Sequence, residues 1–479
     1  MRGLAERLND NYLLFVLLGL ASILIFAYSW VPGGLDVDSC NYAVVAKDIL
    51  YTNKWLNLYD PIYEGPFYYH FPLCIWVTAL LFKSLGITTF AAKLFSMACG
   101  LVLVATIYYF GKLLKDKWVG FFAGISLLLT NHIVRLSRQC RMDIPVTLFI
   151  TLAMLSFFLA QRRRRAYYLL FGLFTCLAIF AKDIFGVFAL AIALGYLVLR
   201  LRFKEIFHPL FLSGIVIALL PVLIWRKLDN NMLFGNWYSA NFMHLWKNIV
   251  IEVPWYYYIW AIVTKYAYLL PFALYGGYLA VREAARNRNY EVYILLIWIA
   301  IFPLAFSFGR HKLHYFILPI YPAAALLAGW AFEAIFKERA KERIAATCKY
   351  IFIFSAVVML CLPLDIRSKR FAQTVRLGPF INQIRKQMPL HEFIVYREDK
   401  SALLFYAYEI KRSRSIDDKK VFEDMLKAKD KSYLCYLSQG SFEELDSLSK
   451  LNSRIVLRYK DKIVLATPKN TDLPVALPE

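Results

Sequence analysis

Residues 33–50 (GGLDVDSCNYAVVAKDIL) and 63–76 (YEGPFYYHFPLCIW) decide how this sequence folds and where its chemistry lies. They follow the first long apolar segment, so Asp36 and Asp38 stand where a membrane span meets water. A polar and aromatic loop then leads to His70, after which the chain becomes apolar again. Two carboxylates at a span end followed by one imidazole are unusual for packing alone. We therefore predict that this loop carries the chemistry.

The composition indicates a membrane protein. The 479 residues are 59% hydrophobic and 19% charged, whereas about 25% of the residues in soluble proteins are charged. Long apolar stretches recur through the first three quarters of the chain, which is typical of a polytopic α-helical membrane protein. The net charge of +22 lies in short basic clusters between these stretches. Such clusters report membrane orientation, and we expect no nucleic-acid partner.

The apolar stretches predict about eleven spans of roughly 20 residues each. They lie near 12–31, 89–111, 118–133, 144–160, 166–181, 184–200, 209–227, 260–281, 291–308, 314–335 and 346–363. With a cytoplasmic N-terminus, the inner loops carry basic clusters at 112–117, 162–165, 200–204, 282–288 and 337–343. All five clusters fall on the same side, and this regularity predicts a multi-pass protein of the bacterial inner membrane. The first segment lacks a small-residue cleavage site and is expected to stay as an anchor.

Two domains are predicted, residues 1–363 in the membrane and residues 364–479 outside it. The stretches VVAKDIL and PLCIWVTALLFKSL, in the first outer loop, predict short interfacial helices. After residue 363, EFIVYR, SYLCYLS, SRIVLRY and DKIVLAT alternate as strands, and KVFEDMLKAK predicts a helix. This pattern predicts a small periplasmic α/β domain. The eight cysteines form no CxxC, so we expect neither a zinc cluster nor an essential disulfide framework.

Acidic and basic side chains gather at the predicted outer ends of the spans. The acids are Asp36, Asp38 and Asp143, and a carboxylate cluster at one membrane face suits general-base chemistry. For Asp36 and Asp38 the alternative is capping of a turn or of the helix that follows. The outer basic residues are Arg135, Arg138, Arg141, Lys182, Arg310, His311, Lys312 and His314. A phosphate-bearing ligand would explain them, with anionic lipid headgroups or local pairing with the aspartates as the alternative for Arg135 and Arg138.

The stretch DSCNYAVVAKDIL resembles the D-E-x-x-Y-A-x-x-A-x-x-x-L signature of GT-C membrane glycosyltransferases, which opens their first periplasmic loop. These enzymes include the protein mannosyltransferase-like enzymes and the aminoarabinose lipid A transferases. YYHFPLCIW is similar to their aromatic–(Glu/His)–Lys–Pro–Pro–Leu segment, RMDIP to their R-L-D-x-P, and AKDIFG to their T-K-G turn. HKLHYFILPIYPAAALLAG is similar to their K-L-x-x-Y-x-L-P-x-x-P-A-L-A-L-L-x-G. The matches follow the family's order over nearly all of residues 1–335.

The resemblance implies a GT-C fold and a sugar donor carried on polyprenyl phosphate. It places Asp38 at the catalytic aspartate and Asp143 at the second acidic position, with Asp36 beside the first. His70 falls where many members have a lysine facing the lipid-linked phosphate. The remaining donor-phosphate residues that it implies are Lys182, Arg141, Arg310, Lys312 and His314. Tyr69 stands where some members have an acid that helps to bind metal, so a divalent metal cofactor is left open.

We predict an inverting glycosyltransferase that acts on lipid A, its core or another envelope glycolipid at the periplasmic face. The donor is already activated, so the enzyme has to hold the phosphate and deprotonate or orient the acceptor. No nucleotide or covalent intermediate is needed, in agreement with the lack of a Gly-rich phosphate loop. The alternatives are transfer to protein Ser/Thr and, less favoured, transport of lipid-linked saccharides, which usually involves midplane sites and internal repeats. We expect a monomer.

Overall fold

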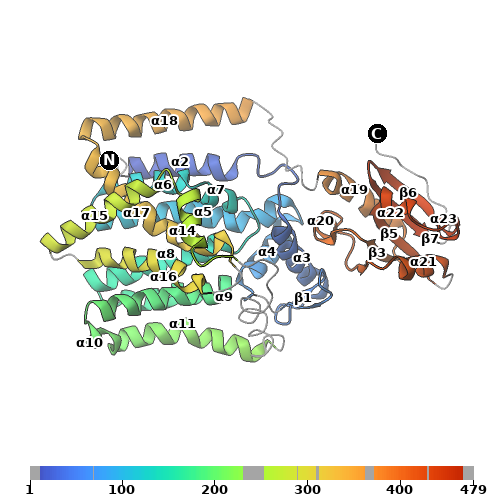
Figure 1. Ribbon diagram of the computed structural model, residues 1–479, viewed down its shortest axis with the longest axis horizontal. Helices are drawn as coiled ribbons and strands as arrows, with labels where there is room; N and C mark the ends of the chain where they lie inside the picture. The colour runs from blue at the N-terminus through green and yellow to red at the C-terminus, as the bar shows by residue number, and fades with distance from the viewer. Residues whose placement is uncertain are drawn as a thin grey trace. The chain divides into compact units, whose positions relative to one another are not determined.

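The computed structural model describes residues 11–67, 70–229, 253–287, 290–308, 312–361, 372–428 and 431–467. Most of the described chain is helical (Figure 1). It divides into two compact units by its contacts. The first unit comprises residues 1–29, 68–77 and 93–365, and the second comprises residues 30–67, 78–92 and 366–479. The predicted domains, 1–363 and 364–479, divide the chain by sequence and do not group the first loop with the C-terminal residues.

The first unit contains most of the long apolar helices. In the described part of the chain, six helical segments are long and apolar enough to cross a membrane. They are α5 (Thr89–Leu114), α8 (Asp143–Arg162), α9 (Tyr167–Leu199), α11 (Pro209–Leu228), η3 with α16 (Tyr290–Ser307), and η4 with α17 (His314–Ile335). Helices α6 (Lys117–Leu129) and α7 (Asn131–Ser137) meet at a 71° bend and count as a seventh only if the bent pair is one span. The predicted polytopic helical membrane protein is confirmed, but the count of about eleven spans is not.

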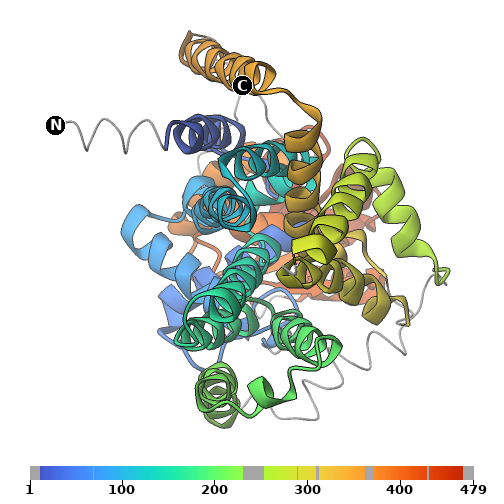
Figure 2. The same cartoon turned by 90° about the vertical axis from the view of Figure 1, so that its left-hand side faces the viewer.

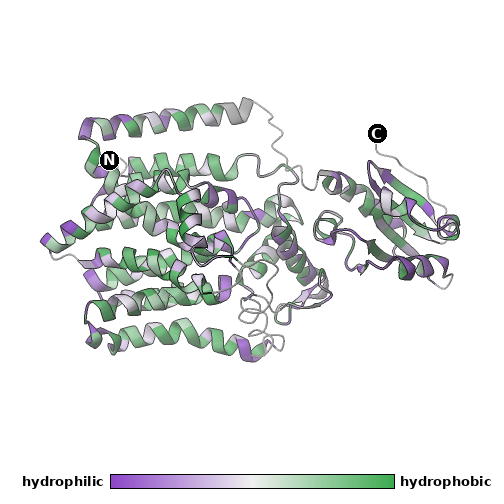
Figure 3. Ribbon diagram, viewed as in Figure 1, coloured by the Kyte–Doolittle hydropathy of each residue, from purple (hydrophilic) through white to green (hydrophobic). Residues whose placement is uncertain are grey.

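The helices of this unit run alongside one another and several are seen end-on in Figure 2. Most of their residues are coloured as hydrophobic on the ribbon of Figure 3. Other predicted spans correspond to the short helix α2 (Tyr12–Phe26), to the two helices α14 (Tyr257–Lys265) and α15 (Leu270–Asn287), and to part of α18 (Glu338–Cys361). The single turn α10 (Phe203–Ile206) lies between two predicted spans. The predicted span 260–281 is divided between α14 and α15. The first turns of α18 are charged (ERAKER), so only its later part matches the predicted span 346–363.

Helix α9 is a hairpin rather than a straight rod. Lys182 (φ −158°, ψ 63°) and Asp183 (φ 39°, ψ −123°) interrupt its helical backbone. The rings of Tyr168 and Tyr196 both pack on Phe157, with centroids 6.1 and 5.7 Å away. A continuous helix would separate Tyr168 from Tyr196 by about 42 Å, since each residue rises 1.5 Å. The chain therefore reverses at Lys182–Asp183, which agrees with two predicted spans, 166–181 and 184–200, joined by a turn.

Small residues allow the close approach that this hairpin requires. A Cβ added to Gly186 would lie 2.2 Å from the backbone nitrogen of Ile179. Where α9 meets α11, a Cβ on Gly172 would lie 2.1 Å from the carbonyl oxygen of Gly214. Both distances are far below van der Waals contact, so these backbones approach as in other tightly packed membrane helices.

The second unit combines the first loop with the C-terminal residues. The loop provides α3 (Val37–Thr52), β1 (Tyr59–Asp60) and β2 (Gly65–Pro66). Helix α4 (Leu73–Leu85) begins in the first unit and belongs to the second unit from Thr78 onward. The C-terminal helices are α19 (Ala372–Gln387), α20 (Lys400–Tyr406), α21 (Lys419–Lys427), α22 (Gln439–Glu443) and α23 (Ser447–Asn452). The strands are β3 (Glu392–Tyr396), β4 (Arg414–Ile416), β5 (Tyr433–Ser438), β6 (Arg454–Tyr459) and β7 (Lys462–Thr467).

The five C-terminal strands form one sheet in the order β4–β3–β5–β7–β6. Strand β3 pairs in parallel with β4 and β5, whereas β7 pairs antiparallel with β5 and β6. The Tyr396 ring stacks on Phe422 of α21 with centroids 4.0 Å apart, which fastens the helix to the sheet. A small C-terminal α/β region is thus confirmed. The short strand β4 was not predicted.

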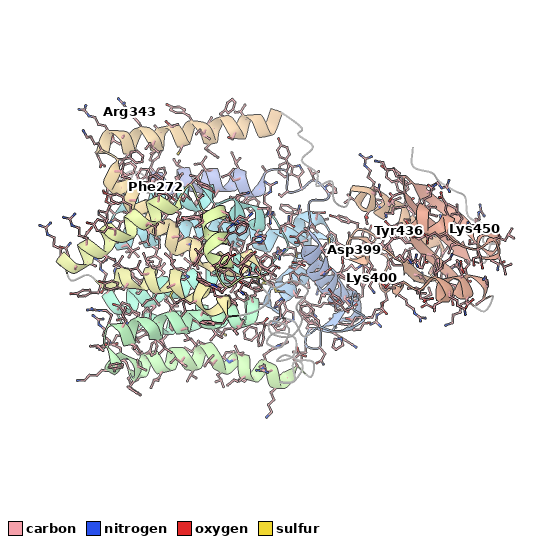
Figure 4. All side chains as sticks on the ribbon, viewed as in Figure 1. Phe272, Arg343, Asp399, Lys400, Tyr436 and Lys450 are labelled. Carbon is pink, nitrogen blue, oxygen red and sulfur yellow. The ribbon has the colours of Figure 1, made fainter. Side chains whose placement is uncertain are left out.

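Within this unit, α3 lies beside α20 (Figure 1). Lys47 of α3 is 1% exposed and donates hydrogen bonds to the carbonyl oxygens of Leu404 and Ile410, the latter at 3.0 Å. Lys400, labelled in Figure 4, donates to the Glu64 carboxylate at 2.6 Å. These contacts attach the first loop to the C-terminal residues.

The buried ammonium of Lys47 predicts a pH-dependent stability. Burial lowers the pKa of Lys47 to about 7, and the nearby Asp48 and Glu409 charges offset this only in part. An unfolded lysine stays protonated to about pH 10.4, so between about pH 7 and 10 the unfolded chain binds more protons. We expect stability to rise with pH over this window, and Lys47→Met to remove that rise. Thermal unfolding of the detergent-solubilised protein at several pH values measures it.

The exposed Lys54→Met is the matched control and should keep the wild-type slope. Equal slopes for wild type and Lys47→Met would contradict the prediction.

Candidate active site

Asp143 lies in the first turn of α8 and is 3% exposed. Arg141 Nε donates to its Oδ2 at 2.9 Å, and Lys182 Nζ donates to its Oδ1. The side chains of Arg141 and Lys182 are only 9% and 8% exposed. One carboxylate between two cations leaves a buried cluster with a net charge of +1. The structure thus brings together three of the predicted site residues.

Aromatic rings surround the two cations of this cluster. Lys182 Nζ lies 4.5 Å from the ring centroid of Phe185 and 5.4 Å from that of Tyr315. The Arg141 guanidinium lies 4.8 Å from the Tyr315 centroid. At such distances the ring faces attract a cation, so the aromatic residues help to hold the charges in a dry environment. Tyr315 contacts both cations but was not among the predicted site residues, although it belongs to the HKLHY motif.

His70 pairs with Asp183, at the α9 reversal. Its Nδ1 lies 2.6 Å from Asp183 Oδ2, and the backbone N–H of Phe71 donates to Asp183 Oδ1 at 2.9 Å. The Asp183 side chain is 2% exposed, whereas that of His70 is 19% exposed. Asp183 lies in the AKDIFG segment, but it was not predicted as a site residue. Its position next to Lys182 was the available signal. Lys182 binds Asp143, and Asp183 binds His70.

Asp183 adopts a backbone conformation that side chains disfavour. Its φ of 39° lies in the region that glycine enters freely. Such a conformation costs on the order of 1–3 kcal/mol and is retained only where the surrounding structure requires it. In the resemblance to the T-K-G turn, Lys182 aligns with the lysine and Asp183 with the glycine. The chain therefore places an aspartate where the motif has the residue best suited to the turn.

Asp36 and Asp38, in the second unit, have different local roles. Asp36 is the N-cap of α3, and its Oδ1 accepts from the backbone N–H of Ser39 at 2.9 Å and from the Ser39 hydroxyl at 2.6 Å. Asp38 lies in the first turn of the same helix. Of the two caps considered from the sequence, the structure therefore assigns the cap to Asp36. The catalytic role of Asp38 stays a prediction.

The other predicted basic residues have separate surroundings. Lys312 Nζ donates to the Val253 carbonyl oxygen at 3.0 Å and is 7% exposed. The His314 ring lies 4.9 Å from that of His132, which was not predicted. Arg310 lies outside the described residues.

Arg138 has a structural role that the sequence left open. It donates to the carbonyl oxygens of Leu24 and Ala27 at 2.9 and 2.7 Å, at the end of α2. The free carbonyls at a helix C-terminus favour a cation there. These backbone carbonyls, rather than the aspartates considered from the sequence, are the partners of Arg138 in the described residues.

The described residues contain no group of three or more His, Cys, Asp or Glu side chains that could hold a metal ion. Both oxygens of Asp143 already accept from cations, and Asp36 caps a helix. Among the described residues, Asp143 therefore has no oxygen left for a divalent metal.

These features define an integral membrane protein with the GT-C fold. The structure superposes on that of ArnT from Cupriavidus metallidurans bound to undecaprenyl phosphate with a TM-score of 0.73, covering 96% of this chain and 99% of the other at 15% identity. The Archaeoglobus fulgidus oligosaccharyltransferase in its apo form gives a TM-score of 0.56 at 12% identity, covering 97% of this chain and 75% of the other. At these identities the likeness shows the fold.

Sequence comparison adds the family context. The model of the dolichyl-phosphate-mannose-protein mannosyltransferase family matches residues 69–225. An undecaprenyl phosphate-alpha-4-amino-4-deoxy-L-arabinose arabinosyl transferase of Aeromonas salmonicida (strain A449) is 27% identical over 333 residues, which are 66% of this chain and 58% of that relative. An uncharacterized protein of Aquifex aeolicus (strain VF5) is 22% identical over 395 residues, 77% of this chain and 72% of the other. The predicted resemblance is confirmed, and the chain spans 58% of the arabinosyl transferase's length.

The ion cluster predicts a strong energetic coupling between Asp143 and Lys182. Asp143→Asn leaves two buried cations without a counter-charge, and we expect it to lower the free energy of unfolding by about 3–5 kcal/mol. Lys182→Gln together with Asp143→Asn should cost clearly less than the sum of the single variants. Unfolding of the purified protein in detergent measures all three.

The exposed Arg135→Gln is the control for loss of an outer cation and should leave stability within about 0.5 kcal/mol of wild type. Additive effects of Asp143→Asn and Lys182→Gln would show that the two side chains do not interact.

Proposed function

We propose that the protein is an inverting glycosyltransferase that moves a sugar from a polyprenyl-phosphate donor to lipid A, its core or another envelope glycolipid. The observation that carries this proposal is the buried cluster of Arg141, Asp143 and Lys182, because its net positive charge suits a phosphate. Two further observations support it. The fold is that of a protein solved with undecaprenyl phosphate, and several relatives are named as undecaprenyl phosphate-aminoarabinose transferases.

In this proposal the basic residues bind the leaving group. When the bond between the anomeric carbon and the phosphate oxygen breaks, the electron pair stays on the phosphate and its charge increases. Arg141 and Lys182 stabilise that charge, with His70, Arg310, Lys312 and His314 as the other candidates. Donors held in place before the reaction need no reorganisation as the charge develops.

Asp143 acts in this proposal as a positioning residue rather than as the base. Both of its oxygens accept from cations, so neither is available to an acceptor hydroxyl. It fixes the Arg141 and Lys182 head groups and reduces their mutual repulsion.

Asp38 is proposed as the base. The acceptor hydroxyl attacks the anomeric carbon from the face opposite the phosphate, and its proton passes to the Asp38 carboxylate. The new C–O bond forms as the bond to the phosphate breaks, so the anomeric configuration inverts. Asp36 is the poorer candidate because its carboxylate caps α3.

The proposed location is the bacterial inner membrane, with a cytoplasmic N-terminus. The five basic inner clusters support this orientation. Segment 33–76 and the domain 364–479 are then periplasmic, and the protein works as a monomer.

Transfer to protein Ser/Thr is the second candidate. The observation that favours it is the match of residues 69–225 to the protein mannosyltransferase family. The two candidates share the donor chemistry and differ in the acceptor.

Deletion of the gene should remove a sugar increment from lipid A or its core, because the enzyme modifies that acceptor. Mass spectrometry of the purified glycolipids measures the increment and identifies the class of sugar. An unchanged glycolipid profile with a changed glycoprotein would favour the second candidate, and restoration by a plasmid copy is the control.

Asp38→Asn should lower the rate of transfer by at least about 100-fold, because an amide cannot take the acceptor proton. Asp36→Asn is the matched control. Asparagine caps helices as well as aspartate does, so α3 and most of the activity should be retained. Glycolipid analysis of complemented deletion cells, with protein levels checked by immunoblot, compares the two. Full activity of Asp38→Asn would exclude it as the base.

A cysteine at Lys54, in an otherwise cysteine-free variant, should react with a membrane-impermeant maleimide in intact spheroplasts. A cysteine at Arg163, in a predicted inner loop, should react only after lysis. The reverse pattern would place segment 33–76 in the cytoplasm and overturn the proposed mechanism.

A further inference from the structure

The His70–Asp183 pair is a feature that the proposed mechanism does not yet explain. Asp183 binds the segment 70–71 twice, once through the imidazole Nδ1 at 2.6 Å and once through the Phe71 backbone N–H at 2.9 Å. Its carboxylate is almost fully buried, whereas part of the imidazole is exposed. The pair therefore joins a nearly buried carboxylate to a partly exposed imidazole.

The backbone conformation of Asp183 indicates that its carboxylate has a specific role at this position. At φ 39° and ψ −123°, Asp183 occupies a conformation that glycine would adopt without strain. A disfavoured conformation persists where the surrounding structure requires it, and here the side chain makes two short contacts.

The two members of the pair are also departures from the motifs that the chain resembles. Asp183 stands at the glycine of the T-K-G turn, and His70 stands at the lysine of the aromatic segment. The positions are 113 residues apart in sequence, yet the side chains touch. Two departures in direct contact suggest that each accommodates the other.

We propose that Asp183 is a positioning residue that orients His70 toward the donor phosphate, so that a histidine–aspartate pair replaces a lysine–glycine pair. This rests on the proposed function. With Nδ1 bound to the carboxylate, the ring presents Nε2 on its opposite edge. In the imidazolium form, Nδ1–H stays bound to the carboxylate while Nε2–H can donate to a phosphate oxygen.

The chemistry explains why a lysine would not need such a partner. A lysine ammonium is a point charge on a flexible stem and reaches a phosphate from several directions. An imidazole is shorter and donates only in the plane of its ring, so its orientation has to be fixed. A carboxylate beside a lysine would instead pair with its ammonium.

The experiment measures binding of undecaprenyl phosphate to the full-length protein in detergent, so its readout is independent of sugar and acceptor. Four variants are compared: Asp183→Gly, His70→Lys, the double variant His70→Lys/Asp183→Gly, and Asp116→Gly. The last is a matched Asp-to-Gly control, because Asp116 is the N-cap of α6 and glycine at such a position costs little.

We expect Asp183→Gly to weaken binding by about 10-fold or more, as loss of an orienting partner commonly does. His70→Lys should also weaken it, because Asp183 then pairs with the ammonium. The double variant should recover affinity to within about 3-fold of wild type, and Asp116→Gly should not change it.

The outcomes separate failure of the inference from failure of the proposed function. If the wild type binds and the double variant is no better than Asp183→Gly, the pair only fastens segment 70–71 to α9, and the inference is wrong. Equal binding by all variants overturns it as well. If the wild type itself does not bind undecaprenyl phosphate, the proposed function fails instead. Melting temperatures of each variant separate loss of affinity from loss of fold.

Discussion

The reversal of α9 at Lys182–Asp183 is the constraint on which the rest of the site depends. Two adjacent residues at this turn extend to two different partners, one to the carboxylate at the start of α8 and one to the loop that contains His70. Because they are neighbours in a fixed turn, the buried cluster and the imidazole are held in one geometry. Gly186, at the close contact with Ile179 within the hairpin, allows this turn to form.

Composition and periodicity were sufficient to predict the architecture. Apolar stretches predicted a polytopic helical protein, and alternating stretches predicted the C-terminal strands β3, β5, β6 and β7, since both signals are local. The number of spans was harder, because α14 and α15 divide one predicted stretch and α18 begins with charged turns. Strand β4 is only three residues long and too short for alternation to be recognised.

Site residues that belong to sequence motifs could be predicted. Site residues identified only by contacts between distant parts of the chain could not. Arg141, Asp143 and Lys182 were predicted as separate residues, and the structure joins them in one cluster. The pairing of Asp183 with His70 could not be predicted, because the two residues lie 113 apart in sequence and no local pattern connects them. The position of Asp183 beside Lys182 was the only local signal. The choice of cap between Asp36 and Asp38 likewise depends on the three-dimensional structure, since both residues suit the start of α3.

The contacts of Lys47 and Lys400 with their partners have an evolutionary consequence. A buried ammonium in α3 is satisfied by carbonyls from the C-terminal residues, and the Glu64 carboxylate is bound by a lysine of α20. Replacing the C-terminal region by gene fusion would therefore remove the partners of Lys47 and Glu64. A lineage that replaced it would need compensating substitutions in α3, the helix that contains Asp38. We therefore expect α3 and the C-terminal residues to be inherited together.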